Sequence, residues 1–169
     1  TKEDLKAHPS FPEARCDYAS VIPYKAQLFH RAYERFKATG NDKELYDKFC
    51  QKNKAWLEDF ALYVVIKKNR NGKAWGEWEK GLRDRNPKEI DIMKKEFHDE
   101  LEREKFLQYL FFKQWLSLKK YCNDKGIRLI GDIPIYVNYD SVDVWTHPQL
   151  FKLDKDKKPT FVAGVPPDY

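Results

Sequence analysis

Apolar residues recur every three or four positions from residue 90 to residue 118, and this periodicity constrains the fold more than any other feature of the sequence. A repeat near 3.6 residues is that of an α-helix with one buried face. Asn86 and Pro87 supply a cap residue and a first-turn proline, and Gly126 supplies a stop. The pattern predicts one long helix or two nearly continuous ones. Its apolar positions are Ile90, Met93, Phe97, Leu101, Leu107, Leu110, Phe111, Trp115 and Leu118.

Shorter amphipathic stretches upstream predict further helices. One follows Ser20 and ends at Gly40, a second covers 42–50, and a third covers 54–68. In the third stretch a strand over "VVI" is the alternative, but the run is short and the helical apolar face is broad. Residues 74–85 predict a helical turn or two, and residues 1–19 predict an irregular lead-in.

The helical spacing of apolar residues ends at Gly126. The run "IRLIGDIPIYV" predicts a short buried strand, and "FKLDKDKKPTFVAG" predicts a small hairpin with a charged turn. A helix, a tight loop and a buried strand are typical of an α/β unit, in which catalytic groups follow the strand ends. Asp132 then lies where a strand over 127–131 ends. The alternative is that Asp132 only caps the next turn.

Charge and cysteine patterns weigh against several classes of protein. The net charge of +5 arises from 32 basic and 27 acidic residues, mostly interleaved as in "KGLRDRNPKEIDIMKKEFHDELEREK". This interleaving predicts a self-paired surface and not a nucleic-acid stripe. Apolar runs are too short for a membrane span. Cys16, Cys50 and Cys122 lack zinc-site spacing, which predicts reduced, mostly buried thiols in a cytoplasmic protein and no metal site.

Polar and aromatic residues gather after Asp132. Carboxylates, hydroxyls and aromatic rings together are typical of sugar sites, where rings cover C–H patches and short polar groups fix hydroxyls. His147 is interpreted as a surface or cap residue, because no nucleophile stands beside it in the sequence. The gathered residues are Tyr136, Asn138, Asp140, Ser141, Asp143 and Trp145, followed by Asp168 and Tyr169 on a proline-stiffened loop.

Several of these stretches resemble a known family. "GIRLIGDIPIYVNYDSVDVW", "LFKLD" and "VAGVPPDY" resemble the 4-alpha-glucanotransferases of glycoside hydrolase family 77, also called amylomaltases or disproportionating enzymes. "DYASVIPYKAQLF", "WLEDFALYVVI", "RDRNP" and "FLQYLFFKQWLSLKKYCNDKGI" are similar in order and spacing. The resemblance covers nearly the whole chain.

The resemblance implies a fold that is mainly α with a small β portion, namely a fragment of a (β/α)8 barrel including its helical insertion. Residues 1–19 are then an irregular lead-in. Residues 20–126 are the helical insertion and a barrel helix, and residues 127–169 are a barrel strand and an active-site loop segment. The absence of Met at position 1 and the stop after "GVPPDY" also suggest a truncated chain.

The resemblance implies transfer of α-1,4-glucan segments between maltooligosaccharides with retention, without metal or organic cofactor. Retention needs a carboxylate nucleophile and a carboxyl that acts as acid and then base, about 5–5.5 Å apart. In the family both follow "GVPPDY", so this fragment is expected to be inactive alone. Asp132 is implied as a supporting active-site residue. The implied glucan-binding residues are Asp132, Tyr136, Ser141, Asp143, Trp145, Pro166, Asp168 and Tyr169.

A different class of function stays open at this point, namely a non-catalytic helical interaction module that uses an aromatic surface. For a barrel fragment we expect the helices before Gly126 to hold the core. The tail is then rearranged, disordered or paired with another chain, and self-association through an exposed barrel edge is one form of such pairing.

Overall fold

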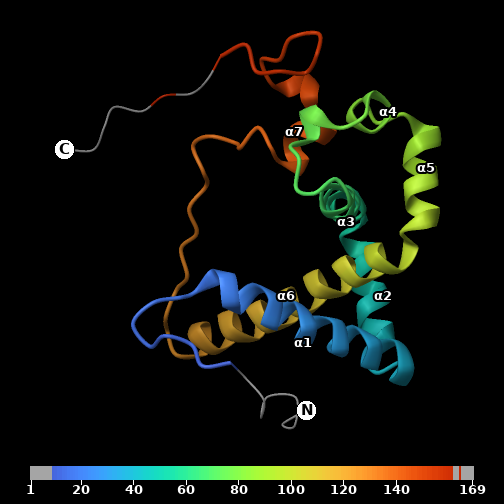
Figure 1. Ribbon diagram of the computed structural model, residues 1–169. Coiled ribbons are helices and arrows are strands. Elements are labelled where there is room, and N and C mark those ends of the chain that lie inside the picture. The colour runs from blue at the N-terminus through green and yellow to red at the C-terminus, as the bar shows by residue number, and fades with distance from the viewer. Residues whose placement is uncertain (1–8, 162–163, 165–169) are drawn as a thin grey trace. The chain divides into compact units, whose positions relative to one another are not determined.

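The computed structural model describes residues 9–161 and residue 164 (Figure 1). Contacts between Cα atoms divide the chain into two compact units, residues 1–52 and residues 53–169. The two units are described separately. Pro166, Asp168 and Tyr169, three of the predicted glucan-binding residues, lie outside the described residues.

The first unit contains α1 (Tyr18–Thr39) and α2 (Lys43–Lys52). Helix α1 ends where the sequence predicts, because Gly40 adopts a φ of 65° and donates its N–H to the Phe36 carbonyl. The Phe36 ring packs edge-on against Tyr46 of α2, with centroids 5.1 Å apart. Tyr33 and Tyr46 are the buried residues of these two helices.

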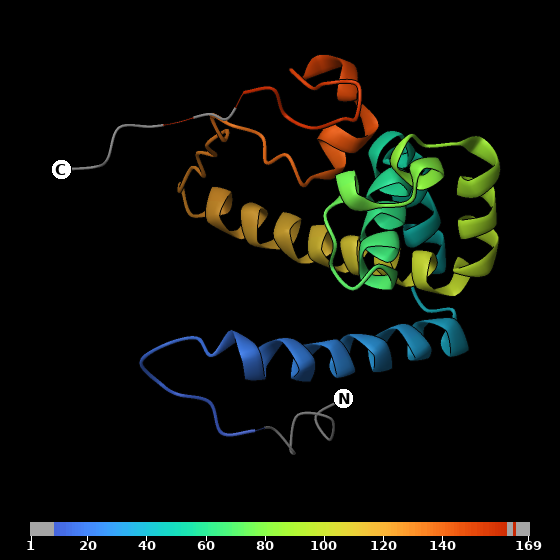
Figure 2. The same cartoon turned by 45° about the horizontal axis from the view of Figure 1, so that its top comes forward.

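The second unit is built around α3 (Lys54–Asn69), which Figure 2 shows alongside the other helices of this unit. Helix α3 packs against α5 (Pro87–Glu96), α6 (His98–Asp124) and α7 (Val142–Thr146). The "VVI" run is helical, so the strand alternative there is wrong. The remaining elements are η2 (Trp75–Glu77), α4 (Lys80–Arg83) and η3 (Pro148–Leu150).

The long periodic segment forms two helices that are almost continuous. Helix α5 begins as predicted at Pro87, and the Asn86 side chain accepts the backbone N–H of Lys88. The break falls at Phe97, whose φ of −109° and ψ of 31° leave the helical region. Gly126, with a φ of 77°, follows the end of α6.

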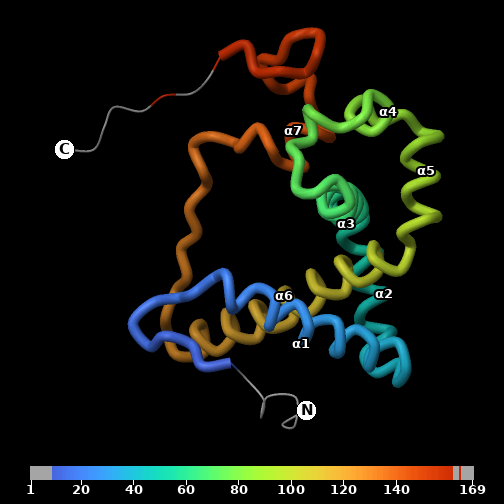
Figure 3. Tube along the Cα trace, in the orientation of Figure 1, coloured from blue at the N-terminus to red at the C-terminus, as the bar shows by residue number. Residues whose placement is uncertain are grey.

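Residues 127–138 form no strand, although a barrel strand was predicted over 127–131. Figure 3 traces this segment as an extended stretch away from the helices. Ile130, Ile133 and Ile135 are 96%, 85% and 88% exposed. A parallel strand is held by neighbours on both sides, and the described part of the chain offers none. The predicted small β portion is limited there to one antiparallel bridge, Leu153 with Pro159, in the predicted hairpin.

The tail contributes to the core more than the sequence suggested. Val144 and Trp145 of α7 are buried in the cluster that contains the α3 residues Ala61 and Ile66. Most of the cluster comes from residues before Gly126, as predicted, and the tail adds two buried residues that the sequence did not indicate. Tyr139, Val142, Phe151 and Leu153 also pack on this cluster from the tail.

Two other expectations concern thiols and membranes. Cys16 is exposed and Cys50 and Cys122 are half-buried, so the prediction of mostly buried thiols is wrong, although none of the three forms a disulfide within the described residues. Among the described helices, none combines the length and apolar composition that crossing a bilayer requires.

Candidate functional site

Asp132 lies on the surface of the extended segment. Its Oδ1 accepts the backbone N–H of the next residue, Ile133, at 2.8 Å. The side chain is exposed and contacts none of the other predicted site residues that the structure describes, so the described part of the chain does not assemble them around Asp132. A local bond to the following residue agrees with a turn-capping role in this structure.

Asp140 anchors the segment that follows to helix α3. Its Oδ1 accepts the Tyr63 hydroxyl at 2.6 Å and the Trp75 backbone N–H at 3.2 Å, and its Oδ2 accepts the Lys67 ammonium. A contact of the preceding residue reinforces this anchor, because the Tyr139 carbonyl accepts the Trp75 indole N–H at 2.7 Å. The loop is thereby tied to residues more than sixty positions away in sequence.

The electrostatics of this anchor favour a charged Asp140. Burial alone raises the pKa of the carboxyl, but the hydrogen bonds from Lys67 and Tyr63 outweigh burial and lower the pKa below its usual value. Burial and the adjacent carboxylate raise the pKa of the Tyr63 hydroxyl, which therefore stays a donor. Asp140 belongs to the polar group that follows Asp132 in the sequence, but nothing in that pattern indicates its role as the anchor.

Ser141, Asp143 and Trp145 are brought together by helix α7, but they point to different surroundings. The Ser141 Oγ accepts the Val144 N–H and caps the helix. Asp143 is exposed in the first turn. Trp145 has no exposed surface, and its indole N–H donates to the Leu82 carbonyl at 3.0 Å. Direct glucan contact by Trp145, as predicted from sequence, is inconsistent with this burial.

Arg85 links Trp145 to helix α3. Its guanidinium carbon lies 4.3 Å from the centroid of the Trp145 ring, and its Nη2 donates to the Asp59 carboxylate at 2.6 Å. A guanidinium that stacks on indole and pairs with a carboxylate holds both in place. Arg85 stands within "RDRNP", and nothing in the sequence indicates this role. Two contacts, at Asp140 and at Trp145, therefore fix the two ends of residues 140–145.

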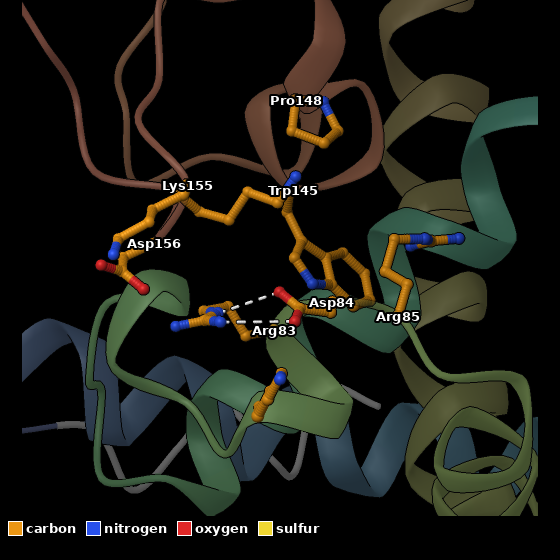
Figure 4. Close-up of a pocket in the computed structure, with 9 residues that line it drawn as sticks. Arg83, Asp84, Arg85, Trp145, Pro148, Lys155 and Asp156 are labelled. Carbon is orange, nitrogen blue, oxygen red and sulfur yellow. Dashed lines mark hydrogen bonds and ion pairs between the residues drawn. The ribbon is translucent and has the colours of Figure 1, made fainter.

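A cavity of about 490 Å³ opens between the α4 region and the hairpin (Figure 4). Figure 4 shows Arg83 at the end of α4 and Asp84 directly after it, with Lys155 and Asp156 on the hairpin segment. The Arg83 guanidinium pairs with Asp84 through contacts of 2.9 and 3.3 Å. The lining residues are Lys80, Arg83, Asp84, Arg85, Trp145, Pro148, Lys155, Asp156 and Lys157.

A second hollow, of about 650 Å³, contains Tyr136, another residue predicted to bind glucan. Its lining is mostly apolar. Among the described residues, no group of three His, Cys, Asp or Glu side chains is arranged to hold a metal ion. The lining residues of this hollow include Ile135, Val137, Val144, Phe151 and Phe161.

Comparison with known proteins assigns this architecture to a family. The family model described as 4-alpha-glucanotransferase, that of glycoside hydrolase family 77, matches residues 1–169. The chain belongs to the 4-alpha-glucanotransferase family. The resemblance stated from the sequence is thereby confirmed, and family membership favours it over the helical interaction module.

Comparison with individual members of the family shows what share of their length this chain covers. A 4-alpha-glucanotransferase of Aquifex aeolicus is 40% identical over 168 residues, which are 99% of this chain and 33% of the relative. The Thermus thermophilus protein is 40% identical over 163 residues, 95% of this chain and 33% of the relative. The chain thus spans about a third of the length of these curated relatives.

A solved structure also matches the fold of this chain. The amylomaltase from Streptococcus agalactiae in complex with acarbose superimposes with a TM-score of 0.92 at 37% sequence identity. The match covers all of this chain and 34% of that one. The helical arrangement described above is therefore the arrangement of a segment of an amylomaltase.

Proposed function

We propose that this chain is a segment of an enzyme that transfers α-1,4-glucan segments between maltooligosaccharides with retention of configuration. The observation that carries the proposal is the family match over the whole chain, supported by the amylomaltase likeness at a TM-score of 0.92. The bound acarbose in that amylomaltase supports glucans and related oligosaccharides as the ligand class.

The segment forms part of a (β/α)8 barrel with its helical insertion in the full protein. In that setting residues 127–131 pair with neighbouring strands, which gives the exposed Ile130 and Ile133 apolar partners. Without those strands the same apolar edge is available for self-association. A cytoplasmic location belongs to the proposal and rests on three cysteines that form no disulfide within the described residues.

Catalysis in the full protein uses two carboxylates about 5–5.5 Å apart, one as nucleophile and one as acid and then base. The family resemblance places both beyond the "GVPPDY" motif. Asp132 orients the substrate beside them. Tyr136, Ser141, Asp143, Pro166, Asp168 and Tyr169 contact the glucan, and Trp145 supports Asp143 from the core.

The proposal is tested by incubating maltotriose with the 169-residue chain and, in parallel, with the longer protein that carries it. Glucose and longer maltodextrins should form only with the longer protein, because it alone holds both carboxylates. Product formation by the 169-residue chain would place the catalytic pair within it and contradict the assignment. An inactive longer protein would contradict the proposed reaction.

The orienting role of Asp132 gives a second prediction. Asp132→Ala in the longer protein should lower turnover of maltotriose at least about tenfold, since a misplaced substrate loses near-attack geometry. Stability should change by no more than about 0.5 kcal/mol, because the side chain is exposed. Asp124→Ala, an exposed change on helix α6, is the matched control and should leave turnover unchanged. Wild-type turnover in the Asp132 variant would remove this role.

A further inference from the structure

The cavity beside α4 departs from the self-paired charge pattern of the rest of the sequence. Two segments far apart in the chain supply five basic side chains to one hollow, against two acidic ones. Asp84 is already occupied by the Arg83 guanidinium. The basic residues are Lys80, Arg83, Arg85, Lys155 and Lys157, and the acidic residues are Asp84 and Asp156.

Three of these cations lack a counter-ion within the described part of the chain. Lys80, Lys155 and Lys157 line the cavity and form no ion pair with any residue that the structure describes. By contrast, several lysines in the helices pair with a carboxylate three or four positions away, as Lys43 does with Asp47. Ammonium groups that share a hollow with fewer carboxylates than cations repel one another, and a bound anion reduces this repulsion.

Two further observations indicate a positive electrostatic potential in the cavity and a hydrogen-bond donor that lacks an acceptor among the described residues. The hydrogen bond from Arg83 lowers the pKa of Asp84, and the charges of Lys157 and Lys80 lower it further. The Arg85 Nη1 is buried and finds no hydrogen-bond acceptor among the described residues. Such a donor is normally satisfied by a partner.

We propose that this cavity binds the phosphate group of a small phosphorylated ligand. Ammonium and guanidinium donors around one hollow are the groups that recognise a phosphate dianion. The volume of about 490 Å³ lies within the range of small-molecule sites and leaves room for an organic group beside the phosphate. A polynucleotide would need a basic stripe, whereas these cations surround a single hollow.

The phosphate proposal does not rest on the proposed transfer reaction. Its test is calorimetric titration of the 169-residue chain with inorganic phosphate and with a hexose phosphate, at constant ionic strength, with the free hexose as a blank. The test variant is K80Q/K155Q. The matched control is K88Q/K158Q, which removes the same charge from neighbouring exposed lysines outside the cavity.

We expect saturable binding of both phosphates, about tenfold weaker in K80Q/K155Q and unchanged in K88Q/K158Q. Tighter binding of the hexose phosphate than of phosphate supports contacts to the organic part, and equal binding supports a site for the phosphate group alone. Circular dichroism of each variant verifies the fold. Absence of binding, or equal weakening in the two double variants, would overturn the proposal.

Discussion

Trp145→Ala is expected to lower the free energy of unfolding of the unit of residues 53–169 by about 3–5 kcal/mol. The side chain is fully buried, and its removal leaves a cavity against the Tyr63 and Trp78 rings, whose centroids lie 5.8 and 5.4 Å away. The change also removes the donor to the Leu82 carbonyl and the ring beneath the Arg85 guanidinium. Urea unfolding followed by circular dichroism measures the loss.

Trp115→Ala provides the matched control for this prediction. Trp115 lies on helix α6 and is 40% exposed, so its truncation should cost about 1 kcal/mol or less. All five tryptophans lie in residues 53–169, which makes tryptophan fluorescence a specific probe of this unit. Equal losses for the two variants would mean that Trp145 is not a core residue in solution.

The helices could be predicted from the sequence because their signals are local. The cap at Asn86, the proline at the first helical position and the spacing of apolar residues all act within a few positions, and the structure begins α5 at Pro87. The break at Phe97 could not be placed as well, since no glycine or proline marks it. There the apolar periodicity continues across two helices that are almost in line.

The site was harder to predict because its contacts are long-range. Nothing near Asp140 in sequence indicates that Tyr63 and Lys67 will donate to it, because the fold of α3 decides that contact. Trp145 stands among polar residues and resembles a sugar-stacking ring, yet tertiary packing buries it. The strand over 127–131 depends on partners that the described residues do not contain.

Asp140→Asn is expected to lower the free energy of unfolding by about 2 kcal/mol at pH 7. An amide retains one acceptor, but its NH2 group would face the Lys67 ammonium or the Tyr63 hydroxyl, each of which donates to the carboxylate. Both ends of the pair are partly exposed, with 31% and 26% of their side-chain surface accessible, so the full cost of breaking a buried pair does not apply. Asp143→Asn, an exposed change in the same segment, should cost no more than about 0.5 kcal/mol.

The pH dependence separates loss of the charged anchor from a general loss of packing. The pKa of Asp140 is lower in the folded chain than its usual 3.8, so the stabilising contribution is present above that value and is lost as the pH falls through the folded pKa. Urea unfolding of wild type and Asp140→Asn at several pH values should therefore give curves that converge below about pH 4. A difference that stays constant to pH 2.5 would show that the amide disturbs packing and that the charge of Asp140 contributes little. Convergence, in contrast, would make the carboxylate the link by which helix α3 holds residues 140–145, the segment that carries Ser141 and Asp143.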